Sequence, residues 1–157
     1  MPRKYQSTEH LLKGDPRYGN KLVSKFINSV MNDGKKSTSQ RLVYGAFDIM
    51  ADRLKDKDPV EVFQQAISNV RPLIQVKSKR VGGATYQVPT EVSRKRAQML
   101  AIRWILESAR GKKGRPLARS LADELIAAYN GDGGAMTTRE NVHKMAEANK
   151  AFSHFAW

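Results

Sequence analysis

Apolar residues recur every three to four positions along most of this 157-residue chain, a spacing that places them on one face of a helix. Asp58 followed by Pro59 is a strong helix start, because the carboxylate accepts free backbone N–H groups and proline suits the first helical position. Ser37 and Thr137 each precede a Gln or Glu at capping-box spacing. The pattern predicts six helices, over 20–31, 37–54, 58–70, 93–110, 116–129 and 137–149.

The apolar period changes to two between residues 73 and 89, which indicates strands instead of helix. The runs 73–81 and 84–89 flank Gly82 and Gly83, and a two-glycine loop suits the turns that join antiparallel strands. We therefore expect one β-hairpin over 73–89. An isolated pair of strands is only marginally stable in water, so the hairpin should project from the helical body and lean on a partner.

Residues 1–19 are polar and basic and have no helical period, so they are predicted to form an extended arm. With this arm, the predicted fold class is mainly α: a bundle of six helices with one protruding β-hairpin. The length suits a single domain, 1–157, that is large enough to bury a core.

Positive charge is concentrated in two blocks of this chain, whose formal net charge is +13. Residues 1–41 carry a net charge of +6 and residues 71–119 carry +11, whereas 42–70 and 120–157 each carry −2. Such clustering is costly in an isolated protein because like charges repel, and a partner that supplies phosphates removes that cost. Nucleic acid is therefore the leading candidate for the partner.

Composition argues against several other classes of protein. The absence of cysteine excludes a disulfide framework, a thiolate nucleophile and a zinc finger. No run approaches the ~20 apolar residues of a membrane-spanning helix, so we expect a soluble, cytoplasmic protein with no membrane contact and no targeting segment.

Catalytic chemistry finds little support in the sequence. His10, His143 and His154 are scattered, and the glycine-rich stretch 131–134 lacks the lysine of a phosphate-binding loop. We therefore expect no enzyme activity, no small-molecule substrate, no metal and no cofactor. His143 is expected to be a partly buried or surface histidine.

Three arginines of the fourth predicted helix, Arg96, Arg103 and Arg110, are seven residues apart and therefore share one face. Guanidinium groups along one stripe suit phosphates and base edges. The alternative is a solvated face on which Arg103 pairs with Glu107 at i,i+4. That pair leaves Arg96 and Arg110 without acidic neighbours, so nucleic-acid contact is the favoured interpretation.

The predicted hairpin also carries basic residues. Lys77 and Lys79 lie on one face of its first strand, Arg80 lies beside the turn, and Tyr86 lies opposite Lys79. Basic residues interleaved with an aromatic on a projecting ribbon can follow a phosphate backbone. The alternative is that the lysines only discourage pairing between sheet edges.

Other conspicuous residues have plainer interpretations. Lys35 and Lys36 fit nucleic-acid contact and simple solubility equally well. Asp123 and Glu124 are expected on a solvated helix face, and the six methionines are expected mostly to fill the core.

Several long stretches carry a resemblance to a known family. They are FIN at 26–28, MNDGKKST at 31–38, NVRP at 69–72, VKSKRVGGATYQVP at 76–89, AIRWI at 101–105 and RENVHKMAEANKAF at 139–152. In these stretches the chain closely resembles the bacterial-type family of small-subunit ribosomal protein seven. The motifs follow one order over nearly the whole chain, and residues 3–15 match least.

The resemblance implies a structural constituent of the small ribosomal subunit that is a primary binder of ribosomal RNA and nucleates assembly of the head, the 3′ major domain. It implies a place at the subunit interface near exit-site tRNA and mRNA, with small-subunit proteins nine and eleven as neighbours, in a bacterial or organelle-encoded ribosome. The residues expected near tRNA and mRNA are Val81, Gly82, Gly83, Ala84 and Tyr86. The candidate ribosomal RNA contacts are Arg3, Lys4, Lys21, Lys25, Lys35, Lys36, Arg41, Arg71, Lys77, Lys79, Arg80, Arg94, Lys95, Arg96, Arg103, Arg110, Lys112, Lys113, Arg115 and Arg119.

Two other classes of protein fit the residues less well. An architectural DNA-binding protein would place a basic hairpin in the minor groove, but a tip of Gly82 and Gly83 has no side chain to wedge between bases. An RNA-modifying enzyme would need a cofactor loop or an acid–base constellation, and the sequence displays neither.

Overall fold

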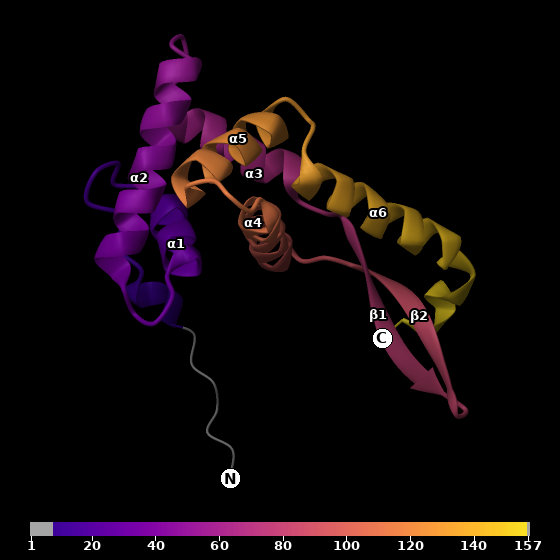
Figure 1. Ribbon diagram of the computed structural model, residues 1–157. Helices are drawn as coiled ribbons and strands as arrows, with labels where there is room; N and C mark the ends of the chain where they lie inside the picture. The colour runs from indigo at the N-terminus through magenta and orange to yellow at the C-terminus, as the bar shows by residue number, and fades with distance from the viewer. Residues whose placement is uncertain (1–7, 157) are drawn as a thin grey trace.

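The computed structural model describes residues 8–156, and for Thr8 and Glu9 it describes the backbone only. Six α-helices, two short 3-10 helices and one antiparallel hairpin lie in this part of the chain, which confirms the predicted mainly α class with one β-hairpin. Figure 1 shows the hairpin projecting from the helical body, with α6 running beside it. In chain order the elements are η1 (Thr8–Leu11), α1 (Lys21–Val30), α2 (Lys36–Arg53), α3 (Pro59–Val70), β1 (Ile74–Val81), β2 (Ala84–Glu91), α4 (Arg94–Gly111), α5 (Leu117–Tyr129), α6 (Gly134–Ala148) and η2 (Lys150–Phe155).

The hydrophobic core lies among α1 to α5, and α5 packs against α2, α3 and α4. Three phenylalanines form its centre, with ring centroids 5.1 Å apart for Phe26 and Phe63 and 5.3 Å apart for Phe47 and Phe63. None of the three is exposed to solvent. Of α6, only Ala135 and Met136 are buried in this core, so the rest of that helix is left to support the hairpin.

Helix starts follow the sequence signals at some positions and depart from them at others. The Asp58 side chain accepts a hydrogen bond from the Val60 N–H at 3.1 Å, as predicted for the start of α3. The two predicted capping boxes are wrong, because α2 begins at Lys36 and α6 begins at Gly134, ahead of Ser37 and Thr137. The start of α6 needs no capping box because the Glu124 carboxylate of α5 accepts a hydrogen bond from the Ala135 N–H in the first turn of α6.

The hairpin has the predicted turn and register. Lys79 pairs with Tyr86 and Val81 pairs with Ala84 across two antiparallel strands. Gly82 and Gly83 have φ values of 58° and 90°. Because both central residues lie at positive φ, the turn is of the primed kind that matches the right-handed twist of the strands.

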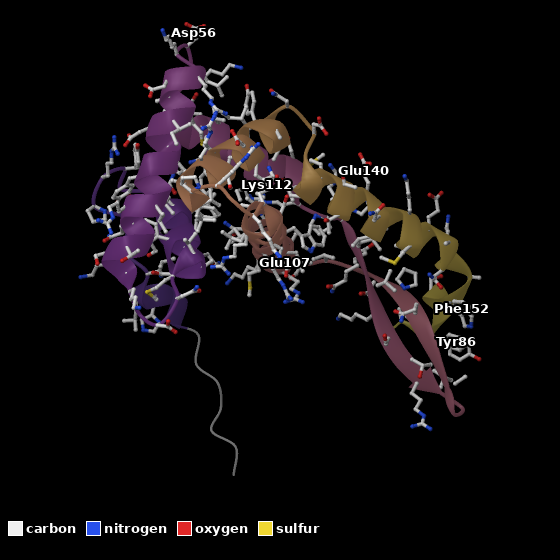
Figure 2. The ribbon with its side chains drawn as sticks, in the orientation of Figure 1. Asp56, Tyr86, Glu107, Lys112, Glu140 and Phe152 are labelled. Carbon is white, nitrogen blue, oxygen red and sulfur yellow. The ribbon has the colours of Figure 1, made fainter. Side chains whose placement is uncertain are left out.

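The hairpin leans on the end of its own chain. The Tyr86 ring lies 5.2 Å from the ring of Phe152 and 5.2 Å from that of Phe155, and Figure 2 shows Tyr86 and Phe152 side by side. The Lys79 ammonium donates to the Phe155 carbonyl oxygen at 2.8 Å. The sequence predicted that the hairpin needs a partner, and η2 supplies that support within the molecule.

The prediction of an extended arm over 1–19 is wrong for its second half, and residues 1–7 lie outside the described part. Asp15 is only 4% exposed, and its carboxylate accepts hydrogen bonds from the backbone N–H groups of Arg17, Tyr18 and Asn20. The Tyr44 hydroxyl of α2 donates to the same carboxylate at 3.2 Å. The buried Asp15 thus fixes the segment 15–20 to the bundle. The lack of a helical period could not reveal this contact, because it depends on α2.

Candidate nucleic-acid interface

The three arginines of α4 share one face, as their spacing predicted, and this face lines a groove between α4 and α1. Arg96, Arg103 and Arg110 share this groove, of about 400 Å³, with Lys25 from α1. The groove thus joins the two basic blocks of the sequence, because Lys25 belongs to the first block and the arginines to the second. We call it the α1–α4 groove.

The three arginines of the groove differ in the contacts they make within the protein. Arg103 forms the expected i,i+4 ion pair, with its Nε 2.8 Å from a Glu107 carboxylate oxygen, and this hydrogen bond raises the pKa of Arg103. Arg110 donates to the Val30 carbonyl oxygen at 3.1 Å and so ties the end of α4 to the end of α1. Arg96 is exposed and has no ion pair within the described part of the chain. Arg96 is therefore the freest of the three for an external anion.

Beyond α4, the basic loop before α5 is partly occupied by internal contacts. The Lys112 ammonium lies 2.9 Å from the carboxylate of Glu124, which is fully buried. The prediction that Glu124 belongs to a solvated face is wrong, because its other carboxylate oxygen accepts from the Ala135 N–H at the start of α6. Arg115 lies 3.6 Å from the Asp123 carboxylate, and Lys113 is exposed. The Lys112 ammonium is thus already paired with a carboxylate within the protein.

The hairpin presents its basic residues unequally. Lys77 and Arg80 are exposed, whereas Lys79 is half-buried against η2. Tyr86 is also half-buried, in the aromatic cluster with Phe152. On the basic face predicted for β1, Lys77 and Arg80 are therefore exposed to solvent, whereas Lys79 is covered by η2.

The remaining candidates are distributed over the helices of the first block and the start of α4. Arg3 and Lys4 lie outside the described residues, and Arg71 is half-buried after α3. Lys35 shares a smaller hollow of about 140 Å³ with Arg110. The other candidates are exposed, namely Lys21, Lys36, Arg41, Arg94, Lys95 and Arg119.

One groove residue was missed because the methionines were expected in the core. Met50 and Met136 are buried, but Met99 and Met145 are each 52% exposed. Met99 lies in the α1–α4 groove among the arginines. A helical pattern alone could not separate it from the core, since Met99 flanks the buried stripe of α4.

A half-buried histidine of α6 lies at the base of the hairpin. His143 is half-buried, as predicted, and its Nε2 accepts a hydrogen bond from the Leu73 N–H at 3.2 Å. Burial lowers the pKa of His143, with a smaller contribution from nearby Arg139. Both effects favour the neutral ring that this hydrogen bond requires.

The arrangement of basic side chains on the groove and hairpin is suited to binding an anionic partner. Within residues 8–156 no cluster of His, Asp and Glu side chains could hold a metal ion, and no helix is long and apolar enough to cross a membrane. A helical body with a cationic groove and a projecting basic hairpin is the architecture of a nucleic-acid-binding protein.

Comparison with known proteins specifies that class. The family model for ribosomal protein S7p/S5e matches residues 2–150. The small ribosomal subunit protein uS7 of Thermotoga petrophila is 58% identical over 91% of this chain and 92% of its own. The uS7 proteins of Thermotoga neapolitana and Methylobacterium radiotolerans are 54% identical over 99% of both chains and 50% identical over 100% of both, respectively.

The chain therefore belongs to the ribosomal protein S7p/S5e family. As a member it is a structural constituent of the small ribosomal subunit, and this family is not a family of enzymes.

Proposed function

We propose that this protein is a primary binder of small-subunit ribosomal RNA that nucleates assembly of the subunit head, the 3′ major domain, in the cytoplasm. The observation that supports this most is the α1–α4 groove, where Lys25, Arg96 and Arg103 gather from two helices. Phosphates of one RNA segment can neutralise these charges together, which releases counterions and favours binding.

The hairpin is proposed to serve a second set of partners. Its tip, 81–84, has no charged side chain, and its two glycines allow close approach of another backbone. We place exit-site tRNA and mRNA at this tip, with small-subunit proteins nine and eleven as neighbours of the protein. The whole chain, 1–157, acts as one domain in this proposal.

Binding to the 3′ major domain of ribosomal RNA should depend steeply on salt. With roughly six or more phosphate contacts at ~0.7 per contact, the slope of log affinity against log salt should be steeper than about −4. Filter binding or fluorescence anisotropy over a salt series measures the slope, and duplex DNA of equal length is the control. A slope near −1 would mean that the basic blocks are mostly solvated and would contradict the proposal.

Removing the hairpin tip should separate assembly from events at the exit site. Deletion of 81–84 with a short relink keeps Lys79 and Tyr86, which hold the hairpin to η2. Ribosomal RNA binding and subunit assembly should stay largely intact, while tRNA retention or reading-frame accuracy changes. The matched control replaces Gly82 with Asn, since Asn-Gly keeps the primed turn. Loss of assembly with normal translation by the surviving particles would show that the tip serves assembly instead.

A further inference from the structure

The floor of the α1–α4 groove is apolar, although its rim is cationic. Met99 is 52% exposed there, Leu100 is half-buried, and Ile102 lies deeper, at 3% exposed. A surface that binds only phosphates has no use for such a floor, because phosphates are held by charged and hydrogen-bonding groups. The exposed methionine therefore needs a second explanation.

The rim also contains one acid. Glu107 lines the groove beside Arg103, to which it is paired. A carboxylate repels a phosphate, but it accepts hydrogen bonds from the amino groups of bases. Both the floor and this part of the rim thus match the chemistry of a nucleobase better than that of a phosphate backbone.

The shape of the surface agrees with this chemistry. At about 400 Å³ the groove falls in the range of ~300–1,000 Å³ that small ligands occupy. A second hollow of about 340 Å³ adjoins it at Lys25 and is lined by Leu12, Lys21 and Leu22. This hollow offers a cationic path along which the strand can continue on one side of the groove.

We propose that the α1–α4 groove binds one unstacked nucleotide of RNA, with its base on Met99 and Leu100 and its flanking phosphates on Arg96 and Lys25. Sequence-specific proteins recognise RNA largely through such splayed bases in loops, bulges and ends. Extruded bases are also held between aromatic or apolar side chains in pockets that take them out of the stack. The inference rests on the proposed function and adds that the groove takes an unpaired nucleotide, not the backbone of a duplex.

Substitutions at Met99 distinguish a base from a phosphate by the direction of the change. Met99→Gln should weaken binding of the 3′ major-domain RNA by about three- to tenfold, the loss expected for one or two methylene-sized apolar contacts. The salt slope should stay unchanged, because no charge is altered. Met99→Leu is the matched control and should bind as the parent chain does. Met99→Lys, which adds a charge, should also fail to strengthen binding.

A groove that takes only phosphates gives the opposite pattern. Met99→Gln would then bind as well as the parent chain, and Met99→Lys would bind more tightly with a slope steeper by about 0.7. Either result overturns the inference while the parent chain's steep salt dependence leaves the proposed function intact. As a second readout, 2-aminopurine placed at unpaired junction positions should change fluorescence on binding at one position, and Met99→Gln should reduce that change. No response at any unpaired position would likewise overturn the inference.

Discussion

Replacing Glu124 with alanine should lower the free energy of unfolding by about 2–3 kcal/mol, because a buried N–H loses its only acceptor and a cavity forms. Glu124 is fully buried, and its carboxylate oxygens accept from the Ala135 N–H and the Lys112 ammonium, each at 2.9 Å. In this variant Lys112 loses its partner, but its side chain is 36% exposed and can turn to solvent. The variant therefore does not leave an unpaired charge buried, which would cost more. Urea titration followed by circular dichroism measures the change.

The neighbouring acid provides the control for this experiment. Asp123 also pairs with cations, Arg53 at 2.5 Å and Arg115 at 3.6 Å, but its side chain is 22% exposed and those of the two arginines are 42% and 60% exposed. Asp123→Ala should therefore cost less than about 1 kcal/mol. Lys112→Ala leaves the Glu124 carboxylate buried without its counter-ion and should destabilise the protein more than Asp123→Ala does. Equal costs for Asp123→Ala and Glu124→Ala would mean that Glu124 does not fix α6 to α5.

Changing Arg96 and Arg103 to alanine together should weaken ribosomal RNA binding by about ten- to a hundredfold, because each removes a charge-assisted contact to phosphate. Both side chains are exposed at the α1–α4 groove, so the melting temperature should hardly change. Gel-shift titration and a thermal melt on the same preparation measure the two quantities. Early unfolding with RNA affinity intact would show that these arginines are structural.

Two comparison variants make this result specific. Lys55→Ala with Lys144→Ala removes the same charge away from the groove; Lys55 adjoins Asp56, which Figure 2 places at the far end of α2. That variant should keep most of the RNA affinity. Arg110→Ala should lower both affinity and stability, since Arg110 also donates to the Val30 carbonyl oxygen. Comparing these variants with the Arg96 and Arg103 double variant separates the effect of total charge on RNA affinity from the effect of charge placed in the α1–α4 groove.

Much of the architecture could be read from local patterns. The apolar period of 3.6 located all six helices, and the change to a period of two located the hairpin. Asp58 and the Gly82–Gly83 pair worked as signals because a helix cap and a tight turn depend on residues that are adjacent in the chain. The seven-residue spacing likewise placed Arg96 and Arg103 on one face of α4, since a helix fixes its own faces.

The errors share one cause, which is that distant residues set the environment. The sequence predicts Glu124 on a solvated face, yet Glu124 is buried because its carboxylate accepts from the Ala135 N–H of α6. Asp15 is buried in the segment predicted as an extended arm, where the Tyr44 hydroxyl of α2 donates to its carboxylate. Thr137 looks like a helix cap, but Glu124 already serves the start of α6. Met99 looks like core, but its side of α4 faces the groove instead of a helix.

By itself, then, the sequence determined the helices, the hairpin and the two basic blocks, because periodicity, turn chemistry and net charge are properties of short stretches. Only the tertiary structure decided which cations are open to a partner. Packing of α1 on α4 brings Lys25 beside Arg96, whereas packing of α5 and η2 engages Lys112 and Lys79 in internal contacts. Whether each of these cations is exposed or paired depends on contacts between segments far apart in the chain, and a local sequence pattern does not determine such contacts.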